Sequence, residues 1–164
     1  MAPISFFAAA VPGDEGQQRE HRDVEILRSV PGMGKVVAAT VLAEASGPLA
    51  ERDYQALRTH AGIAPVTKQS GKRRTVVMRY ACNGRLRYAL YHWARVAAIC
   101  DPASKTYYAA LRQRGHSYAR ALRSVADRLL RILVAMLESD SLFDSTHLRR
   151  SPDPTAAPEA PCAA

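Results

Sequence analysis

Features that often reveal a protein's class are absent from this 164-residue sequence. Its three cysteines form no CxxC pair, and none of its five histidines stands at ligand spacing from another, so no structural zinc site is indicated. The longest apolar run near the start, ISFFAAAV, is too short to span a bilayer and lacks the basic flank of a secretion signal. We therefore expect a cytoplasmic protein with no membrane segment, no metal site and no cofactor of its own.

Acidic residues are missing from one long stretch. Residues 54–100 contain nine Lys or Arg and no Asp or Glu, whereas the whole chain has 23 basic and 15 acidic residues. The remainder therefore carries 14 basic and 15 acidic residues, and the formal charge of +8 is concentrated in this stretch. Such a distribution suits a polyanionic partner such as DNA, although a merely soluble basic face is the simpler alternative.

The hydrophobic pattern predicts a mainly α-helical protein with one domain over residues 23–144. Residues 1–22 show neither helical nor strand period and are predicted to be a flexible lead-in. Residues 145–164 hold four prolines and many alanines and are predicted to be a disordered tail. The short segment TVVMR, rich in β-branched residues, favours at most one very short strand pair.

A helix-hairpin-helix element is predicted over residues 24–46. The segments VEILRSV and VVAATVLAEA have helical period, and VPGMGK between them carries Gly32, Gly34 and Lys35. Glycines let a backbone approach a phosphate, and the free N–H groups at the start of the second helix can bind that anion. An ordinary turn between two helices explains the same residues.

The later helices have clear start signals. Asp53, Asn83, Asp101 and Ser117 each precede a segment with helical period, and Pro102 suits a first turn. A helical bundle is therefore predicted over residues 83–140. Its apolar stripes are predicted to form the core, or for the last helix a dimer seam: Leu86, Leu90, Trp93 and Ala97, then Leu122, Val125, Leu129, Ile132, Leu133 and Met136.

The segment GIAPVTKQSGKRR, residues 62–74, is predicted to be a basic loop around Ser70. Serine is a weak nucleophile that needs a base, a metal or a strongly cationic setting, and only the last is present in this segment. The residues alone favour a phosphate contact or a turn over a nucleophile. The predicted DNA-binding residues are Lys35, Lys68, Lys72, Arg73, Arg74, Arg79, Arg85 and Arg87.

Four blocks together resemble the C-terminal transposase domain of the IS110/IS116/IS902 type of insertion-sequence transposases. They are ILRSVPGMGKVVAATVLAE, YQALRTHAGIAPVTKQSGKRR, CNGRLRYALYHWA and YYAALRQRGHSYARALRSVADRLLRILVAML, in the family's order over about residues 24–144. The resemblance implies a DNA recombinase that inserts and excises a mobile element. Better understood members are guided by a structured bridge RNA.

The resemblance also assigns site residues. It implies that Ser70 is a covalent nucleophile that attacks a DNA phosphate. Gly62, Pro65 and Gly71 match the frame of the family's serine loop, as Gly32 and Gly34 match its glycine hairpin. Asn83 and Gly84 match the family's Gly-Asn block in inverted order, which puts the role of Asn83 in question.

Complete members of that family begin with a RuvC-like domain whose acidic residues bind divalent metal. We find no room for it before Val24, and so expect a partial copy in which Mg²⁺ and its carboxylates come from elsewhere. By the resemblance, the intact enzyme is expected to be a homo-oligomer. A non-catalytic helix-hairpin-helix module that binds nucleic acid, and a dimerising transposase fragment, remain alternative functions.

Overall fold

The structure is a computed structural model that describes residues 14–71 and 73–144, with side chains from residue 22 onward and Arg74 excepted. Seven helices and one antiparallel strand pair occupy these residues, so the predicted mainly α fold with one short strand pair is confirmed. The tail at 145–164, the first 13 residues and Lys72 lie outside the described residues.

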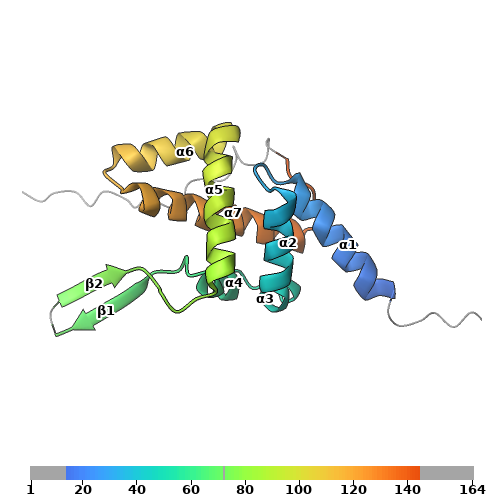
Figure 1. Cartoon of the computed structure of the whole chain (residues 1–164), viewed down its shortest axis with the longest axis horizontal. Helices are drawn as coiled ribbons and strands as arrows, with labels where there is room; N and C mark the ends of the chain where they lie inside the picture. Colours follow the sequence, from blue (N-terminus) through green and yellow to red (C-terminus); the bar gives the residue numbers. More distant parts are fainter. Residues whose placement is uncertain (1–13, 72, 145–164) are drawn as a thin grey trace, which may run out of the picture.

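Helix α5 (Gly84–Cys100) is the centre of the fold. It packs against α2 (Lys35–Glu44), α6 (Pro102–Gln113) and α7 (Tyr118–Glu138), and Figure 1 shows it upright with α7 crossing behind it. Its predicted stripe is confirmed as core: Leu86, Leu90, Trp93 and Ala97 are all at most 1% exposed. Buried residues from Ile26 to Leu137, far apart in the sequence, thus share one hydrophobic core.

The predicted stripe of α7 is also core. Leu122, Val125, Leu129, Leu133 and Met136 are buried in the fold, and Ile132 is half-buried. The apolar face that suggested a dimer seam is therefore covered by this chain's own helices. Two of its arginines pack on aromatic rings, since Arg128 lies over the Tyr107 ring and Arg131 over the Tyr54 ring.

The helix starts follow local capping chemistry. The Asp53 carboxylate accepts hydrogen bonds from the second and third N–H groups of α4 (Tyr54–His60), and Asp101 caps α6 in the same way. Asn83 caps α5 through the N–H of Leu86. Each satisfies donors that the helix itself leaves free, so these starts were predictable from the sequence.

One helix boundary differs from the sequence prediction. Helix α1 spans Asp14–Ser29, so residues 14–22, expected to belong to the lead-in, are helical. This first part, DEGQQREHR, is almost entirely polar. A search for apolar periodicity cannot find a polar helical turn, although Glu, Gln and Arg are good helix formers.

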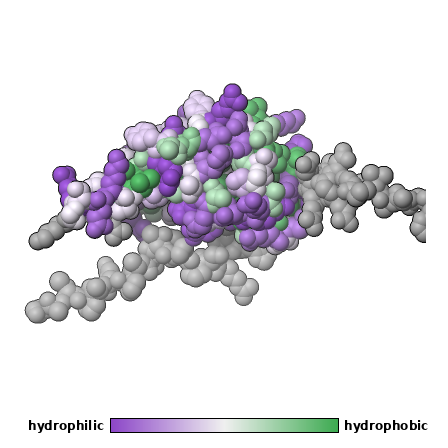
Figure 2. Space-filling view, turned by 90° about the horizontal axis from the view of Figure 1, so that it is seen from below, coloured by the Kyte–Doolittle hydropathy of each residue, from purple (hydrophilic) through white to green (hydrophobic). Residues whose placement is uncertain are grey.

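The strand pair projects from the helical body. Strands β1 (Val66–Ser70) and β2 (Arg73–Val77) form a hairpin that extends to one side in Figure 1, and four of the five β1 residues are exposed. Short helix α3 (Ser46–Ala50) and α4 lead into it. Seen from below, the hairpin and much of the body carry hydrophilic side chains (Figure 2).

Candidate nucleic-acid interface

Ser70 is the last residue of β1 and is exposed. The segment predicted as a loop over 62–74 is therefore largely a β-hairpin, in which Ser70 pairs with Arg73 across a two-residue connection. Gly71 begins that connection with φ 55°, a left-handed conformation that favours glycine. The sequence prediction missed β1 because Lys, Gln and Ser do not indicate a strand, and no burial accompanies them.

The register of the hairpin groups Ser70 with cations. Successive side chains of a strand point to opposite faces, so the pairs Lys68–Thr75 and Ser70–Arg73 lie on one face. Side chains in such directly opposite pairs are near neighbours. A shallow surface hollow is lined by Lys68, Gln69, Ser70, Arg73, Thr75 and Val77. No carboxylate or imidazole is among these lining residues, so the hollow favours an anion.

The foot of the hairpin is fixed to the helical body by Gly62. Gly62 is buried with φ 70°, and a Cβ there would lie 2.6 Å from the Sγ of Cys82. The two chain segments that enter and leave the hairpin therefore pack tightly. The Asn83 N–H also donates to the His60 carbonyl at 2.9 Å. Pro65, exposed, immediately precedes β1.

The inverted Asn-Gly order left the role of Asn83 in question, and the structure shows that its side chain makes two contacts that position α5. Besides capping α5, its side-chain amide donates to a Glu44 carboxylate oxygen at 2.7 Å. Arg85 donates to the other oxygen at 3.2 Å, and the His60 ring contacts the Glu44 carbonyl at 2.9 Å. The hydrogen bond from Asn83, followed by that from Arg85, lowers the pKa of Glu44. No sequence pattern predicts these contacts, because Glu44 and Asn83 are 39 residues apart.

The glycine turn of the predicted helix-hairpin-helix lies far from Ser70. Gly32, with φ 79°, packs so closely on α5 that a Cβ would lie 2.8 Å from the Ala97 backbone nitrogen. The Trp93 indole donates to the Pro31 carbonyl. Ala97 is 13 residues into α5, about 20 Å along the axis from its start beside the hairpin. Lys35 and Gly34, both exposed, share this distant end.

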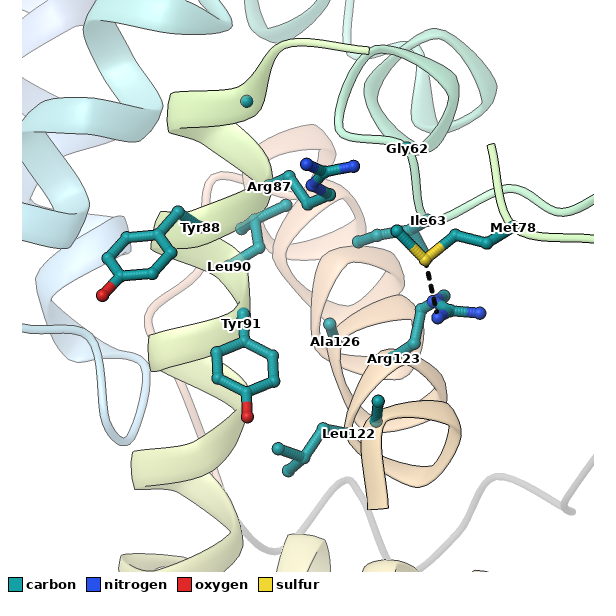
Figure 3. Close-up of a pocket in the computed structure, with 12 residues that line it drawn as sticks. Gly62, Ile63, Met78, Arg87, Tyr88, Leu90, Tyr91, Leu122, Arg123 and Ala126 are labelled. Atoms are coloured by element: carbon teal, nitrogen blue, oxygen red, sulfur yellow. Dashed lines mark hydrogen bonds between the residues drawn. The ribbon is translucent and has the colours of Figure 1, made fainter. Parts of the chain in front are cut away.

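Two of the predicted DNA-binding arginines are half-buried rather than free on the surface. The Nε of Arg79 and one terminal nitrogen of Arg87 are buried without a hydrogen-bond partner among the described residues. Arg87 lines a pocket between α5 and α7 at the foot of the hairpin (Figure 3). The exposed cations close to Ser70 in the described hairpin are thus Lys68 and Arg73.

Comparison with known protein families identifies the group to which the sequence is related. The model of the transposase IS116/IS110/IS902 family matches residues 24–109, just over half of the chain, including Ser70 and the whole hairpin. The chain belongs to this transposase family. The resemblance carried by the four sequence blocks is therefore confirmed.

Individual relatives cover most of the chain. The IS117 mini-circle protein of Streptomyces coelicolor is 38% identical over 127 residues, 77% of this chain. The IS116 44.8 kDa protein of Streptomyces clavuligerus is 38% identical over 73% of this chain, and the IS900 42 kDa protein of Mycobacterium paratuberculosis 35% over 79%. The chain spans only 31%, 30% and 33% of these three relatives.

Two further observations concern metal ligands and membrane-spanning helices. Within residues 14–71 and 73–144, no group of three or more His, Cys, Asp or Glu side chains is arranged to hold a metal ion. The described side chains therefore do not fit the divalent metal that the family resemblance implies. No helix in the same part of the chain is long and apolar enough to cross a membrane.

Proposed function

We propose that this chain is the serine-bearing part of a DNA transposase and that Ser70 is its nucleophile. The observation that carries the proposal is the position of Ser70. It is exposed at the end of a projecting hairpin, directly opposite Arg73 and on the same face as Lys68. A serine with two cations and no carboxylate in its hollow suits attack on a phosphodiester.

The proposed step is a transesterification. The Ser70 oxygen forms a bond to a DNA phosphorus, one phosphorus–oxygen bond to deoxyribose breaks, and the released sugar oxygen takes up a proton. One phosphodiester replaces another, so no oxidant or reductant is needed. Lys68 and Arg73 neutralise the phosphate oxygens while charge develops on them.

The proton of the serine hydroxyl needs an acceptor that the hollow does not provide. The family resemblance implies that a RuvC-like domain with Mg²⁺ completes the site, and no step of our proposal is assigned to a metal held by the described residues. We therefore propose that this polypeptide alone binds DNA but transfers strands poorly. By the same resemblance, the intact enzyme uses a bridge-type guide RNA and is a homo-oligomer.

The test places Ser70→Ala in a complete homologous transposase. Covalent protein–DNA product, detected as a slower band in denaturing electrophoresis, is expected to disappear while DNA binding stays within about twofold. Thr75→Ala, on the same face of the hairpin, is the matched control and should keep the covalent product. Unchanged recombination by the Ser70 variant would refute the assignment. A Ser70-linked strand formed by the 164-residue chain alone would refute its proposed dependence on other residues.

A non-catalytic DNA-binding module is the second candidate. The observation in its favour is the exposed start of α2, where nothing lies within 4 Å of a Cβ built at Gly34 and Lys35 is exposed. This helix-hairpin-helix function would place the main phosphate contact at Lys35. If this second function is correct, the Ser70→Ala enzyme should form as much covalent protein–DNA product as the wild-type enzyme.

A further inference from the structure

A pocket of about 320 Å³, open to solvent on one side, lies between α5 and α7, where the hairpin joins the helical body (Figure 3). It is separate from the hollow at Ser70, and the two share no lining residue. Ile63, Leu90, Leu122 and Ala126 supply apolar walls. This volume is at the small end of the range for small-molecule sites, about 300–1,000 Å³.

Two arginines line this apolar pocket with hydrogen-bond donors that lack good acceptors. One terminal nitrogen of Arg87 is buried and has no partner among the described residues. Arg123 donates to the thioether sulfur of Met78 at 3.0 Å, and sulfur is a weak acceptor. Unsatisfied buried donors are costly, and guanidinium donors bind phosphate or carboxylate oxygens most strongly. The pocket therefore suits a ligand with both an apolar ring and an anionic group.

Aromatic side chains border the same place. Tyr91 lines the pocket, and its hydroxyl is engaged by that of Tyr118, which raises the pKa of Tyr91. Tyr88, at the edge of the pocket, turns its ring away from Arg87 and Met78 (Figure 3), and that ring is 66% exposed. Tyr80, in the segment that leaves the hairpin, is 79% exposed and is not a lining residue. Both rings lie outside the pocket, where neighbouring bases of a bound strand would stack. Exposed aromatic rings beside cations are the usual platform for unstacked bases.

We infer that the pocket binds one unstacked nucleotide of a nucleic-acid strand, with the base between the apolar walls and the phosphate at Arg87 and Arg123. The inference rests on the proposed function only in taking nucleic acid as the partner. A carboxylate-bearing protein segment is less favoured, because residues 54–100 carry nine basic and no acidic residues. A base pair inside a duplex could not enter, so the strand must be single or locally opened.

The pocket and Ser70 can serve the same strand. Four residue steps separate Val66, at the foot of β1, from Ser70, which is about 13 Å at the rise of a strand. Val66 itself does not line the pocket, so at about 3.4 Å per stacked nucleotide a base in the pocket would lie at least about four nucleotides from the phosphate at Ser70. A pocket at this distance would hold the strand open beside the reacting bond.

The experiment fills the pocket from its rim with Ala119→Phe. Ala119 lines the pocket but is exposed, so the larger side chain has room to enter without disrupting the core. Ala135→Phe, at an exposed position on the same helix away from the pocket, is the matched control. Binding of this chain to two probes is measured by fluorescence anisotropy: a nine-thymidine oligonucleotide, and the same deoxyribose-phosphate chain without bases.

Wild type and Ala135→Phe are expected to bind the thymidine oligonucleotide about tenfold more tightly than the baseless chain. Ala119→Phe should lose most of that difference while binding the baseless chain normally. A second pair tests the anion contact and does not depend on the rim variant folding. Arg123→Met should weaken oligonucleotide binding at least fivefold more than Arg120→Met, which removes the same charge from an exposed position on α7.

Equal base dependence in the Ala119→Phe and Ala135→Phe variants, with equal losses for the two arginine variants, would overturn the pocket assignment alone. No binding of either probe by the wild type would overturn the DNA partner of the proposed function as well. A shift of the monomer–dimer balance in Ala119→Phe, with unchanged base dependence, would assign the pocket to a second copy of the chain and refute the nucleotide site.

Discussion

Two glycine turns of this domain look alike in sequence but differ in how closely they pack on the rest of the fold. PGMGK and SGKRR each combine glycine with cations, and both Gly32 and Gly71 have left-handed φ values, 79° and 55°. A Cβ at Gly32 would lie 2.8 Å from the Ala97 backbone nitrogen, whereas nothing lies within 4 Å of one at Gly71. The first glycine permits close packing on α5, and the second permits only a tight turn at an open tip.

The sequence pattern suggested phosphate binding for both turns, but this difference in packing favours it at only one of them. A turn packed against α5 supports the helix from which the site residues extend, but its Gly32 is half-buried against Ala97. The hairpin tip leaves its backbone and the neighbouring Ser70 accessible to a strand. Contact between the backbone and DNA is therefore expected at Gly71 rather than at Gly32.

The largest expected effect is on stability and concerns Gly32→Ala. Left-handed φ costs a non-glycine residue about 1–2 kcal/mol, and forcing a methyl group against the α5 backbone adds roughly 1–3 kcal/mol. We expect the free energy of unfolding, measured by urea denaturation, to fall by about 3 kcal/mol. Gly71→Ala should lose only about 1 kcal/mol, since the φ cost alone applies there.

Gly34→Ala is the control within the same turn. Gly34 has an ordinary φ of −74° and open space around it, so this variant should stay within about 1 kcal/mol of the wild type. Equal losses for Gly32→Ala and Gly71→Ala would show that the packing on Ala97 does not distinguish the two turns.

The same comparison shows what the sequence can and cannot predict. Helix starts at Asp53, Asn83 and Asp101 depend on neighbouring residues, and the stripes of α5 and α7 on local periodicity, so both were predictable. The packed role of Gly32 depends on Ala97, 65 residues later. Likewise, Arg87 and Arg123 meet at one pocket only through the packing of α5 on α7.

The hairpin shows an intermediate case. The β-branched residues of β2 indicated a strand, but VTKQS in β1 has little strand character apart from its first two residues. Pairing with β2 and the turn at Gly71 impose the strand on it. The face shared by Ser70, Lys68 and Arg73 follows from that register, which a one-residue slip would have reversed.

A second prediction separates the two turns by their effect on DNA binding. Each phosphate that a cation neutralises on duplex DNA contributes about 0.9 to the slope of log affinity against log salt concentration. Lys68→Gln combined with Arg73→Gln should therefore lower the slope by about 1.8, while Lys35→Gln should leave it within about 0.3. Titrations of a duplex oligonucleotide with each variant, at salt concentrations from about 50 to about 200 mM, would measure this slope.

The outcome for Lys35 decides between the two candidate functions. A loss of slope in Lys35→Gln with none in the hairpin variant would favour the helix-hairpin-helix module over the serine hairpin. A flat salt response in the wild type would contradict both.

The smallest expected effect concerns Glu44, which ties α2 to the start of α5 beside the hairpin. The hydrogen bonds from Asn83 and Arg85 hold the pKa of Glu44 below its usual 4.5, so the folded state favours the ionised carboxylate. This contribution to stability is fully present above pH 4.5 and is lost as the pH falls through the lower folded-state pKa.

Glu44→Gln should therefore be less stable than the wild type at pH 7, and the difference should shrink steadily below pH 4.5. Urea denaturation across pH 3–7, about the window in which this group titrates, would measure the difference in the free energy of unfolding. The control for removing one charge is Glu51→Gln, at an exposed position after α3. A difference that persists unchanged at pH 3, about the foot of that window, would show that Glu44 acts through packing and not through its charge.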